Sequence, residues 1–422
     1  MKILYVSQYF QPEMGAPAAR AAELARYWAR GGHEVTVLTG FPNHPTGVVP
    51  LEYRSKFRRM IGREDSEGVK VVRTWLLPFP NRKPYERMLN YSSFCLSAGI
   101  TGLFLRRPDV IIASSPQLLV GLSGWWIARN KSVPFIFEIR DLWPESLAAV
   151  GMGSEASLLH RSLGKIADFL YRCADHVVVV TPAFQKYLAE HRRVPPEKLS
   201  VIENGVEIDL FSPQSTNPDV RKELEADGKF IVSYIGTMGM AHGLETLVET
   251  AAQLQGVARE VLFLVVGEGS DKQHVIDLVR LRGLTNVRFL GQQPREKIPA
   301  YISASDACLV HLKKSDIFKT VIPTKMLEFM SCARPVILGV DGLAREIVEE
   351  AQAGIFIEPG NAADLARAVI TLLSNSRLRE FFGRNGRRYV VQNYSRQQTA
   401  RAYIDLLKNV VGERVQHCAA GV

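Results

Sequence analysis

The sequence lacks most of the features that would reveal a function directly. Its five cysteines are scattered and form no CxxC pair, which argues against a disulfide scaffold or a zinc site and fits a reducing cytosol. A strand-like run begins at Ile3, so we expect no signal peptide. A Walker sequence and a complete GxGxxG fingerprint are missing. No DxD-like acidic pair stands beside a predicted strand end, so we expect neither a cofactor nor a metal-bridged diphosphate.

Composition describes a globular protein of more than one domain. The chain has 422 residues, of which 46% are hydrophobic and 23% charged, and this length exceeds one ordinary core. The net charge is +9, and the basic residues gather in two clusters. These clusters are Arg54, Lys56, Arg58, Arg59 and Arg63, and then Arg82, Lys83 and Arg87. Such clusters suit the phosphates of nucleic acid or anionic lipid, although an ordinary basic surface would look the same.

Residues Met88–Leu105 carry no charge and lie between Arg87 and Arg106. Eighteen residues just reach the length of a membrane span, but the segment contains an asparagine and several serines. We therefore expect a core helix before the strand at 109–113. A helix that lies partly in the bilayer surface, flanked by the basic clusters, is the alternative.

Short apolar runs alternate with helical patterns along both halves of the chain. These runs do not alternate between polar and apolar residues, which indicates parallel strands covered on both faces. In the first half the predicted strands are 3–7, 34–39, 69–73, 110–114, 135–139, 177–180 and 199–202. In the second half they are 230–235, 261–266, 287–290, 307–310, 335–338 and 354–357. We interpret residues 206–228 as the interdomain link and predict an α/β fold of two open parallel sheets in tandem.

The segment Ile322–Ile337 carries the strongest functional signal. Pro323 suits the first position of a helix and Thr324 its first turn, so free backbone N–H groups and the positive end of the helix dipole form an anion site. One turn later Glu328 interrupts an apolar face, and its carboxylate can accept two hydrogen bonds from a ribose diol. A phosphate grip and a diol acceptor on one helix indicate a nucleotide. A surface helix with a solvated glutamate is the competing interpretation.

Further candidates follow the ends of predicted strands, where open parallel sheets bind ligands. Gly236–Gly243 is a glycine-containing loop in which His242 could donate to a diphosphate, and Gly267-Glu268-Gly269 closes the next strand. Arg140 and Asp141 follow a strand of the first half, where Arg140 could face phosphate and Asp141 a sugar hydroxyl. A simple strand-to-helix turn and a strand-end salt bridge are the structural alternatives.

Taken in order, these pieces resemble glycosyltransferase family 4, and the resemblance spans nearly the whole chain. The matching pieces are the Gly15 loop, Val201–Val206, Phe211–Pro213, Gly236, His242-Gly243, Val265–Gly269, Asn286–Gly291 and Lys325–Glu328 through Ile337. The resemblance implies two facing Rossmann-like domains (the GT-B fold) with a deep interdomain cleft. The first domain would comprise 1–205 plus a returning C-terminal helix at about 395–422, and would bind the acceptor. Residues 206–394 would form the nucleotide-sugar domain.

The resemblance also implies roles for the candidate residues. Asp141, Lys325 and Glu328 are the expected catalytic residues, with Glu328 on the ribose and Asp141 on the transferred sugar. The expected donor-binding set is Gly15, Arg140, Gly236, Thr237, His242, Gly267, Glu268, Phe289, Pro323, Thr324, Lys325 and Glu328. Residues Arg288–Gly291 would flank the base through backbone groups.

Several positions depart from the family pattern. Thr320 stands where the first of two glutamates is usual, and Thr237 replaces an arginine and His242 a lysine. The usual histidine of the first domain's strand-end motif is Arg140 here or is absent. With Asp141–Glu145 and Pro323–Lys325, the chain looks like the bacterial cell-surface polysaccharide branch, often described as transferring N-acetyl-L-fucosamine or a related N-acetylated hexose. Lys325 would then take over diphosphate charge held elsewhere in the family by arginine and lysine.

The expected function is that of a retaining glycosyltransferase. It would move an N-acetylated hexose or deoxyhexose from a UDP-sugar to a polyprenyl-diphosphate-linked saccharide in O-antigen, lipopolysaccharide, capsule or exopolysaccharide synthesis. We expect a cytoplasmic protein with peripheral contact to the anionic inner face of the membrane, and no nucleic-acid partner. A UDP-sugar 2-epimerase of the same fold and a non-catalytic nucleotide-sugar-binding protein are the alternatives.

Overall fold

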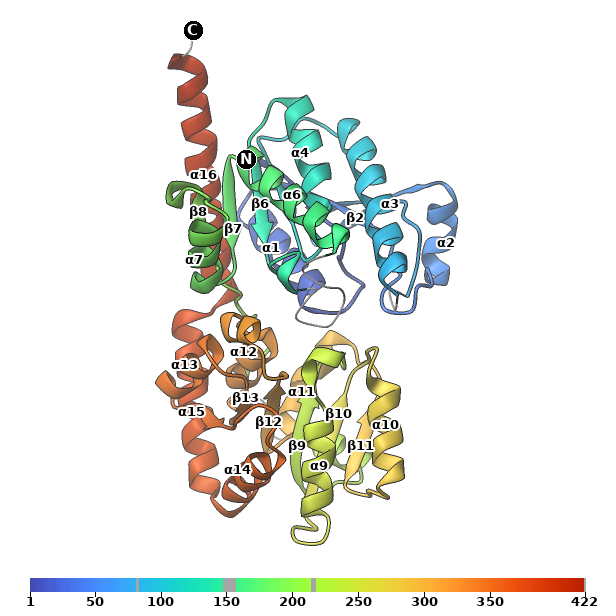
Figure 1. Ribbon diagram of the computed structural model, residues 1–422, viewed down its shortest axis with the longest axis vertical. Helices are drawn as coiled ribbons and strands as arrows, with labels where there is room; N and C mark the ends of the chain where they lie inside the picture. Colours follow the sequence, from blue (N-terminus) through green and yellow to red (C-terminus); the bar gives the residue numbers. More distant parts are fainter. Residues whose placement is uncertain (81–82, 147–156, 214–217, 421–422) are drawn as a thin grey trace. The chain divides into compact units, whose positions relative to one another are not determined.

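The computed structural model describes residues 1–80, 83–146, 157–213 and 218–420, and the chain divides into two compact domains. Residues Met1–Asn204 and Gln397–Val422 form the first, and Gly205–Arg396 form the second. Each is described by itself (Figure 1).

In its described part the first domain contains one eight-stranded sheet in the order β3-β4-β2-β1-β5-β6-β7-β8. The strands are β1 (Lys2–Ser7), β2 (Glu34–Gly40), β3 (Ile61–Ser66), β4 (Val69–Thr74), β5 (Val110–Ser114), β6 (Phe135–Ile139), β7 (His176–Val179) and β8 (Leu199–Val201). Pairing is parallel except between β3 and β4. All the strands predicted for this half are confirmed, at or next to the predicted residues.

Strand β3 was not predicted. Its antiparallel pairing with β4 shows that the expectation of a purely parallel sheet was wrong for this domain. It pairs antiparallel with β4 through a tight turn at Glu67-Gly68. Its residues Gly62–Ser66 are mostly polar because an edge strand has few buried positions to fill. The apolar-run criterion therefore missed it.

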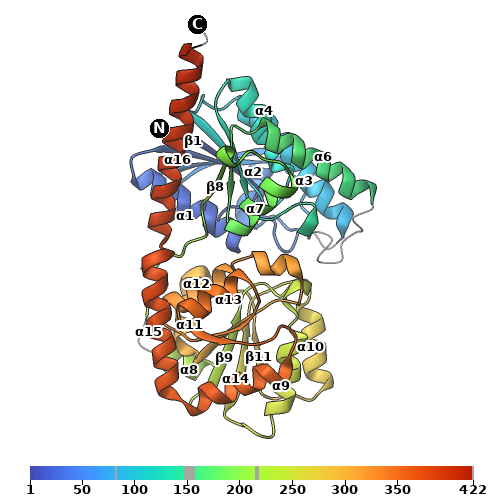
Figure 2. The ribbon, with the colours of Figure 1, turned by 60° about the vertical axis from the view of Figure 1, so that its left-hand side comes forward.

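Helices cover both faces of this sheet. They are α1 (Ala16–Arg30), α2 (Leu51–Arg58), α3 (Pro84–Leu103), α4 (Val120–Lys131), α6 (Leu158–Cys173), α7 (Pro182–His191) and α16 (Arg396–Ala420). Helices α1 and α16 share one core with β1, β2 and β5 (Figure 2), whereas α4 packs on β5, β6 and α3. Trp28 of α1 fastens α16, since its Nε1 donates to the carbonyl of Ala400 at 3.1 Å and its ring meets Tyr403 edge-on.

The expected core helix before β5 is only half confirmed. Tyr91, Phe94 and Ala98 of α3 are buried, but Leu96 and Ile100 on its other face are exposed. Among the described residues, no helix is both long and apolar enough to cross a bilayer.

The second domain repeats the plan with an all-parallel sheet, β11-β10-β9-β12-β13-β14, in the residues described. Its strands are β9 (Phe230–Ile235), β10 (Val261–Val266), β11 (Val287–Leu290), β12 (Ala307–His311), β13 (Val336–Gly339) and β14 (Gly354–Phe356). Its helices are α8 (Pro218–Glu223), α9 (Glu245–Leu254), α10 (Lys272–Leu281), α11 (Ile298–Ala304), α12 (Thr324–Ser331), α13 (Leu343–Glu350), α14 (Ala362–Ser374) and α15 (Ser376–Asn393). Helices α9, α10 and α14 share one core with the sheet, and α11, α12 and α13 share the other.

The interpretation of 206–228 as an interdomain link was wrong for most of the described residues. Val206, Phe211 and Leu224 are buried in the core of the second domain. Arg387 of α15 donates to the carbonyls of Ile208, Phe211 and Ser331, and so ties this segment to α12. The sequence did not indicate these buried contacts because the segment is rich in turn-forming residues. Residues 214–217 of the segment lie outside the described residues.

Replacing Trp28 by alanine should destabilise the first domain by about 3–5 kcal/mol, because a 1%-exposed indole is lost and a cavity is left under α16. Urea unfolding followed by circular dichroism measures the effect. Trp126→Ala, at a 46%-exposed position on α4, is the matched control and should cost far less. Equal losses in the two variants would contradict this description of the core.

Candidate functional site

The side chain of Lys325 crosses the carboxyl end of β9. It starts from the first turn of α12, and its Nζ donates to the hydroxyl of Tyr234 at 2.9 Å while lying 4.0 Å from the centre of that ring. The path exists because residue 236 is glycine: a Cβ there would lie 2.8 Å from Nζ, and the backbone φ is +144°. The Tyr234 hydroxyl in turn donates to the carbonyl of Thr237 at 2.6 Å. Three sequence-predicted residues, Gly236, Thr237 and Lys325, therefore come together.

Loss of solvation disfavours the charged form of Lys325. It lowers the pKa of Lys325 from 10.5 to about 7, although the nearby Glu328 carboxylate opposes the shift. An ammonium held with little solvation is attracted strongly to any anion that enters its surroundings. The position is therefore prepared for a negatively charged ligand.

His242 lies beside the same tyrosine, with ring centroids 6.0 Å apart. Burial, and then the charge of Lys325, lower the pKa of His242 to about 3, so the imidazole is neutral. Nδ1 of the ring lies 3.2 Å from both the amide nitrogen and the carbonyl oxygen of Gly239, so this glycine holds the imidazole in either neutral tautomer. His242 can thus take part in hydrogen bonding without adding charge. It ends a short 3-10 turn, Met240–His242, which precedes α9.

His311, at the end of β12, holds this loop in place and was missed by the sequence analysis. Its Nε2 accepts from the amide of Gly360 at 3.0 Å, so its Nδ1 carries the proton and donates to the carbonyl of His242 at 2.7 Å. Burial lowers the pKa of His311 and favours this neutral form. The sequence signal that could have identified His311 is its position as a polar residue directly after the apolar run 307–310.

The loops after β9 and β10 meet at glycines. A Cβ on Gly267 would lie 2.1 Å from the carbonyl oxygen of Gly236, so a side chain there would force the two loops apart. The amide of Met238 donates to the carbonyl of Glu268 at 2.8 Å. The Glu268 carboxylate pairs with Lys272. Phe289 is the third residue of β11, pairs with Val265 of β10 and packs against the sheet core.

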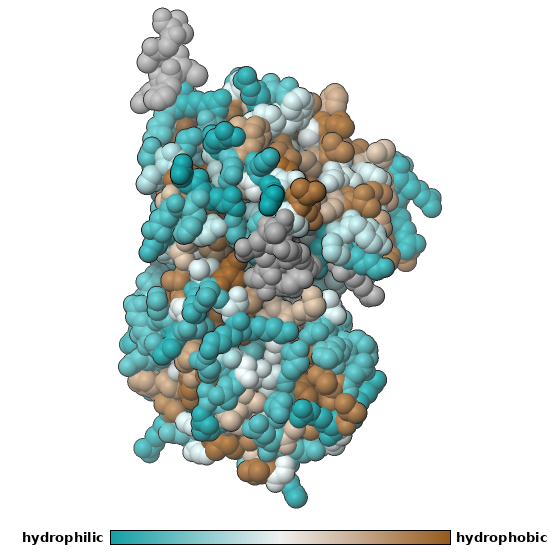
Figure 3. Space-filling model, viewed as in Figure 1, coloured by the Kyte–Doolittle hydropathy of each residue, from teal (hydrophilic) through white to brown (hydrophobic). Residues whose placement is uncertain are grey.

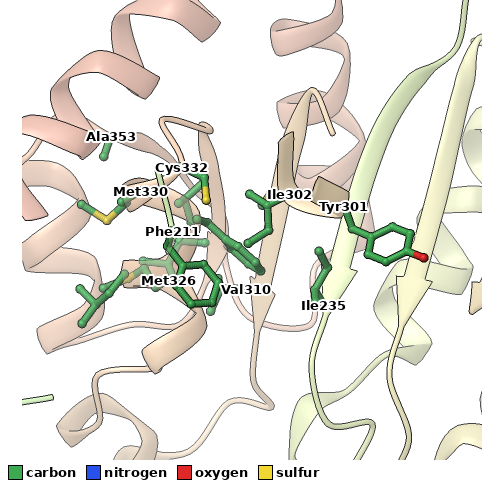
Figure 4. Packing of buried hydrophobic residues seen from close by; sticks show 14 of the residues in the cluster. Phe211, Ile235, Tyr301, Ile302, Val310, Met326, Met330, Cys332 and Ala353 are labelled. Carbon is green, nitrogen blue, oxygen red and sulfur yellow. The ribbon is translucent and has the colours of Figure 1, made fainter. Parts of the chain in front are cut away.

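Helix α12 begins at Thr324, and Pro323 is its N-cap residue rather than its first helical residue. No side chain caps this end, so backbone N–H groups of the first turn remain for a ligand or water. Below it, Met326 and Met330 point into the core beside Phe211 and Val310 (Figure 4). This packing fixes the direction of the helix and of Lys325.

Glu328 is mostly buried, with 13% of its side chain exposed, and it accepts from Nη1 of Arg295 at 3.1 Å. Arg295 itself stacks over the ring of Phe211. This arginine, in the turn Arg295–Lys297 after β11, was not predicted. The pairing holds the carboxylate in place one turn into α12.

In the first domain Arg140 and the Gly15 loop come together. Gly15 is the N-cap residue of α1, and the Arg140 guanidinium donates to the carbonyls of Ala16 and Pro17 at 3.0 and 3.2 Å. Asp141 lines a small cavity with Ser115 and Trp143. Burial raises the pKa of Asp141.

Glu13 is a second unpredicted residue at this edge. Its carboxylate is buried and accepts from the amides of Asn43 and His44, each at 2.9 Å, so it joins the loops after β1 and β2. Burial raises the pKa of Glu13 to about 7 in spite of these hydrogen bonds. In the sequence Glu13 lies between Pro12 and Gly15, and this composition predicted a loop without indicating a buried carboxylate.

Comparison with known proteins identifies the family. Residues 15–205 match the glycosyl transferase 4-like domain, and residues 216–409 match the glycosyl transferases group 1 model. The two matches cover nearly the whole chain, which therefore belongs to the group 1/family 4 glycosyltransferases. It is an enzyme of the glycosyltransferase class with the predicted GT-B fold.

The similar proteins are named as glycosyltransferases or are known as a nucleotide-sugar complex. A putative colanic acid biosynthesis glycosyl transferase, WcaI of Escherichia coli K12, is 26% identical over 78% of this chain and 81% of its own. The probable glycosyltransferase WbjE of Pseudomonas aeruginosa is 22% identical over 66% and 69%. Among solved structures, Anabaena HepE in complex with UDP-glucose superposes with a TM-score of 0.73 at 18% identity, over 97% of this chain and all of that one. At this identity the likeness concerns the fold.

The partly buried Lys325 predicts a pH dependence of stability. Between about pH 7 and 10 the unfolded chain binds the lysine proton and the folded chain does not, so the free energy of unfolding rises with pH by up to about 1.4 kcal/mol per unit. Lys325→Met should remove this slope. Urea unfolding of both proteins at pH 7, 8 and 9 measures it, with the exposed Lys297→Met as control. Parallel profiles for wild type and Lys325→Met would contradict the assigned burial.

Proposed function

We propose that the chain transfers a sugar from a UDP-sugar to a lipid-linked saccharide, with retention of the anomeric configuration. The observation that carries this proposal is the approach of the Lys325 ammonium to the carboxyl end of β9, on the same helix as Glu328. Diphosphate charge would meet Lys325, the amino end of α12 and the imidazole of His242. The ribose diol would meet Glu328.

The proposed donor set does not use a bridging metal ion, because the sequence has no acidic pair beside a strand end to hold one. Cationic and dipolar groups then stabilise the departing diphosphate alone. Gly267 and Glu268 would border the donor, and the backbone around Phe289 would flank the base. Solved relatives supply support for the nucleotide, since HepE is described in complex with UDP and with UDP-glucose.

In the proposed reaction the bond between the anomeric carbon and the diphosphate oxygen breaks, and a bond from an acceptor hydroxyl forms on the same face. The acceptor proton passes to the leaving diphosphate, so no enzyme carboxylate is needed as nucleophile. The first domain would hold the acceptor, with Asp141 touching the transferred sugar and Arg140 keeping the Gly15 turn in place.

The names of similar proteins support the proposed acceptor class: one is named for colanic acid biosynthesis, and another, WaaG, is described as involved in lipopolysaccharide biosynthesis. We therefore infer a role in O-antigen, capsule or exopolysaccharide synthesis, with a polyprenyl-diphosphate-linked acceptor and an N-acetylated hexose or deoxyhexose as the donor sugar. Such an enzyme would work from the cytoplasm on the inner face of the membrane.

Glu328→Ala should weaken UDP binding by about 1.5–3 kcal/mol, roughly 10- to 150-fold, because hydrogen bonds to an ionised group are lost. Isothermal titration calorimetry with UDP measures the loss. Glu296→Ala, an exposed glutamate next to Arg295, is the control and should bind as wild type does. Unchanged affinity in Glu328→Ala would remove the ribose role from this residue.

A panel of nucleotide sugars screened by thermal shift should identify the donor, because only ligands of the folded state raise its melting temperature. The best donor, incubated alone and followed by nuclear magnetic resonance, should give slow hydrolysis to UDP and free sugar. A 2-epimer would instead establish the epimerase, and an unchanged donor the non-catalytic binder. Stabilisation by GDP-sugars but not UDP-sugars would overturn the proposed donor.

A further inference from the structure

Helix α3 of the first domain carries a stripe of large apolar residues that the fold leaves uncovered. The stripe consists of Tyr85, Leu89, Leu96 and Ile100, with Phe104 at the C-cap. Their spacing of four and seven residues puts them along one side of the helix. Leu96, Ile100 and Phe104 are 69%, 60% and 83% exposed.

The neighbouring helix extends this stripe. A Cβ on Gly99 would lie 3.6 Å from the indole of Trp126, so this 46%-exposed ring of α4 lies against α3 beside Ile100. In Figure 3 hydrophobic residues gather over the part of the first domain that carries α3 and α4. Because Tyr91, Phe94 and Ala98 already bury the opposite side of α3, packing does not require the outer side to be apolar.

Cationic side chains stand at both ends of the stripe. Lys83 and Arg87 lie at its amino end, and Arg106 and Arg107 at its carboxyl end. Arg107 and Lys131 are anchored there: Arg107 donates to the carbonyls of Lys131 and Ser132, and Lys131 donates to those of Leu103 and Leu105. Within residues 83–107 and 120–131 the sequence has one acidic residue, Glu86. Arg82, the first residue of the second basic cluster, lies outside the described residues.

From this arrangement we propose that the α3 stripe, with Trp126, docks the protein on an anionic lipid bilayer. Its leucine, isoleucine and aromatic side chains would enter the boundary between headgroups and acyl chains, and the basic residues at either end would meet lipid phosphates. A second copy of the chain fits less well, because a two-fold contact through this stripe would bring like-charged ends together.

This proposal rests on the proposed function, because a lipid-linked acceptor gives the protein a reason to bind a membrane. Binding to lipid can nevertheless be measured without turnover. This proposal takes up the alternative that the uncharged segment raised. In it α3 would lie along the bilayer surface with its outer side in the lipid, while Tyr91, Phe94 and Ala98 on its inner side stay in the protein core.

Sedimentation with vesicles of phosphatidylcholine alone, or with about 30% phosphatidylglycerol, tests the proposal. Wild type should bind the anionic vesicles, and Leu96→Glu/Ile100→Glu should bind them at least roughly tenfold more weakly, because two carboxylates enter the contact. Val257→Glu/Leu281→Glu changes two apolar residues, 80% and 82% exposed, in the second domain. This control adds the same charge and should bind as wild type does. Salt should weaken the binding.

UDP-induced thermal shift in all three proteins separates the two proposals. Vesicle binding that follows this pattern without any UDP response would leave the docking surface standing and count against the proposed function. The docking proposal is overturned if Leu96→Glu/Ile100→Glu binds anionic vesicles like wild type while it still responds to UDP. Equal binding to neutral vesicles, or a stripe-dependent dimer in sedimentation velocity in place of vesicle binding, would also overturn it.

Discussion

Lys325 places its ammonium 2.9 Å from the Tyr234 hydroxyl, over an aromatic ring and beside a glycine, in surroundings that hold its pKa near 7. Such burial of a cation opposes folding unless something offsets it. The features around it make sense together: Gly236 leaves the path open, His242 is neutral, and α12 directs uncapped N–H groups to the same edge. This region of the second domain is organised for an anion, and the proposed UDP-sugar supplies one.

The parallel sheets explain why these groups meet although they are far apart in sequence. All six described strands of the second domain point the same way, so the loops that follow β9, β10 and β12 lie at one edge of the sheet. The segment after β12 leads into α12, whose amino end therefore starts from the same edge. Close backbone packing at Gly267 and the bridge from His311 to His242 and Gly360 then fix the loops relative to one another. Rigid loops on a stiff sheet allow charge to be placed accurately.

Much of this could be predicted because buried parallel strands leave continuous apolar runs, and those runs indicated every described strand except β3. The polar edge strand β3 has no such run, and the turn-rich residues 206–228 concealed Phe211 and Leu224 as core. The partnership of Glu328 with Arg295 could not be predicted, since it depends on how two loops are brought together. Glu13 was missed for the same reason: only its tertiary amide partners distinguish it from a solvated loop carboxylate.

Proton uptake on UDP binding tests the central claim most directly. At pH 8 Lys325 is largely neutral, and a bound diphosphate raises its pKa, so binding should take up nearly one proton. Titration calorimetry in two buffers of different ionisation enthalpy measures this number. The account predicts uptake in wild type and in His242→Asn, and none in Lys325→Met. UDP binding without proton uptake in wild type, or undiminished uptake in Lys325→Met, would contradict it.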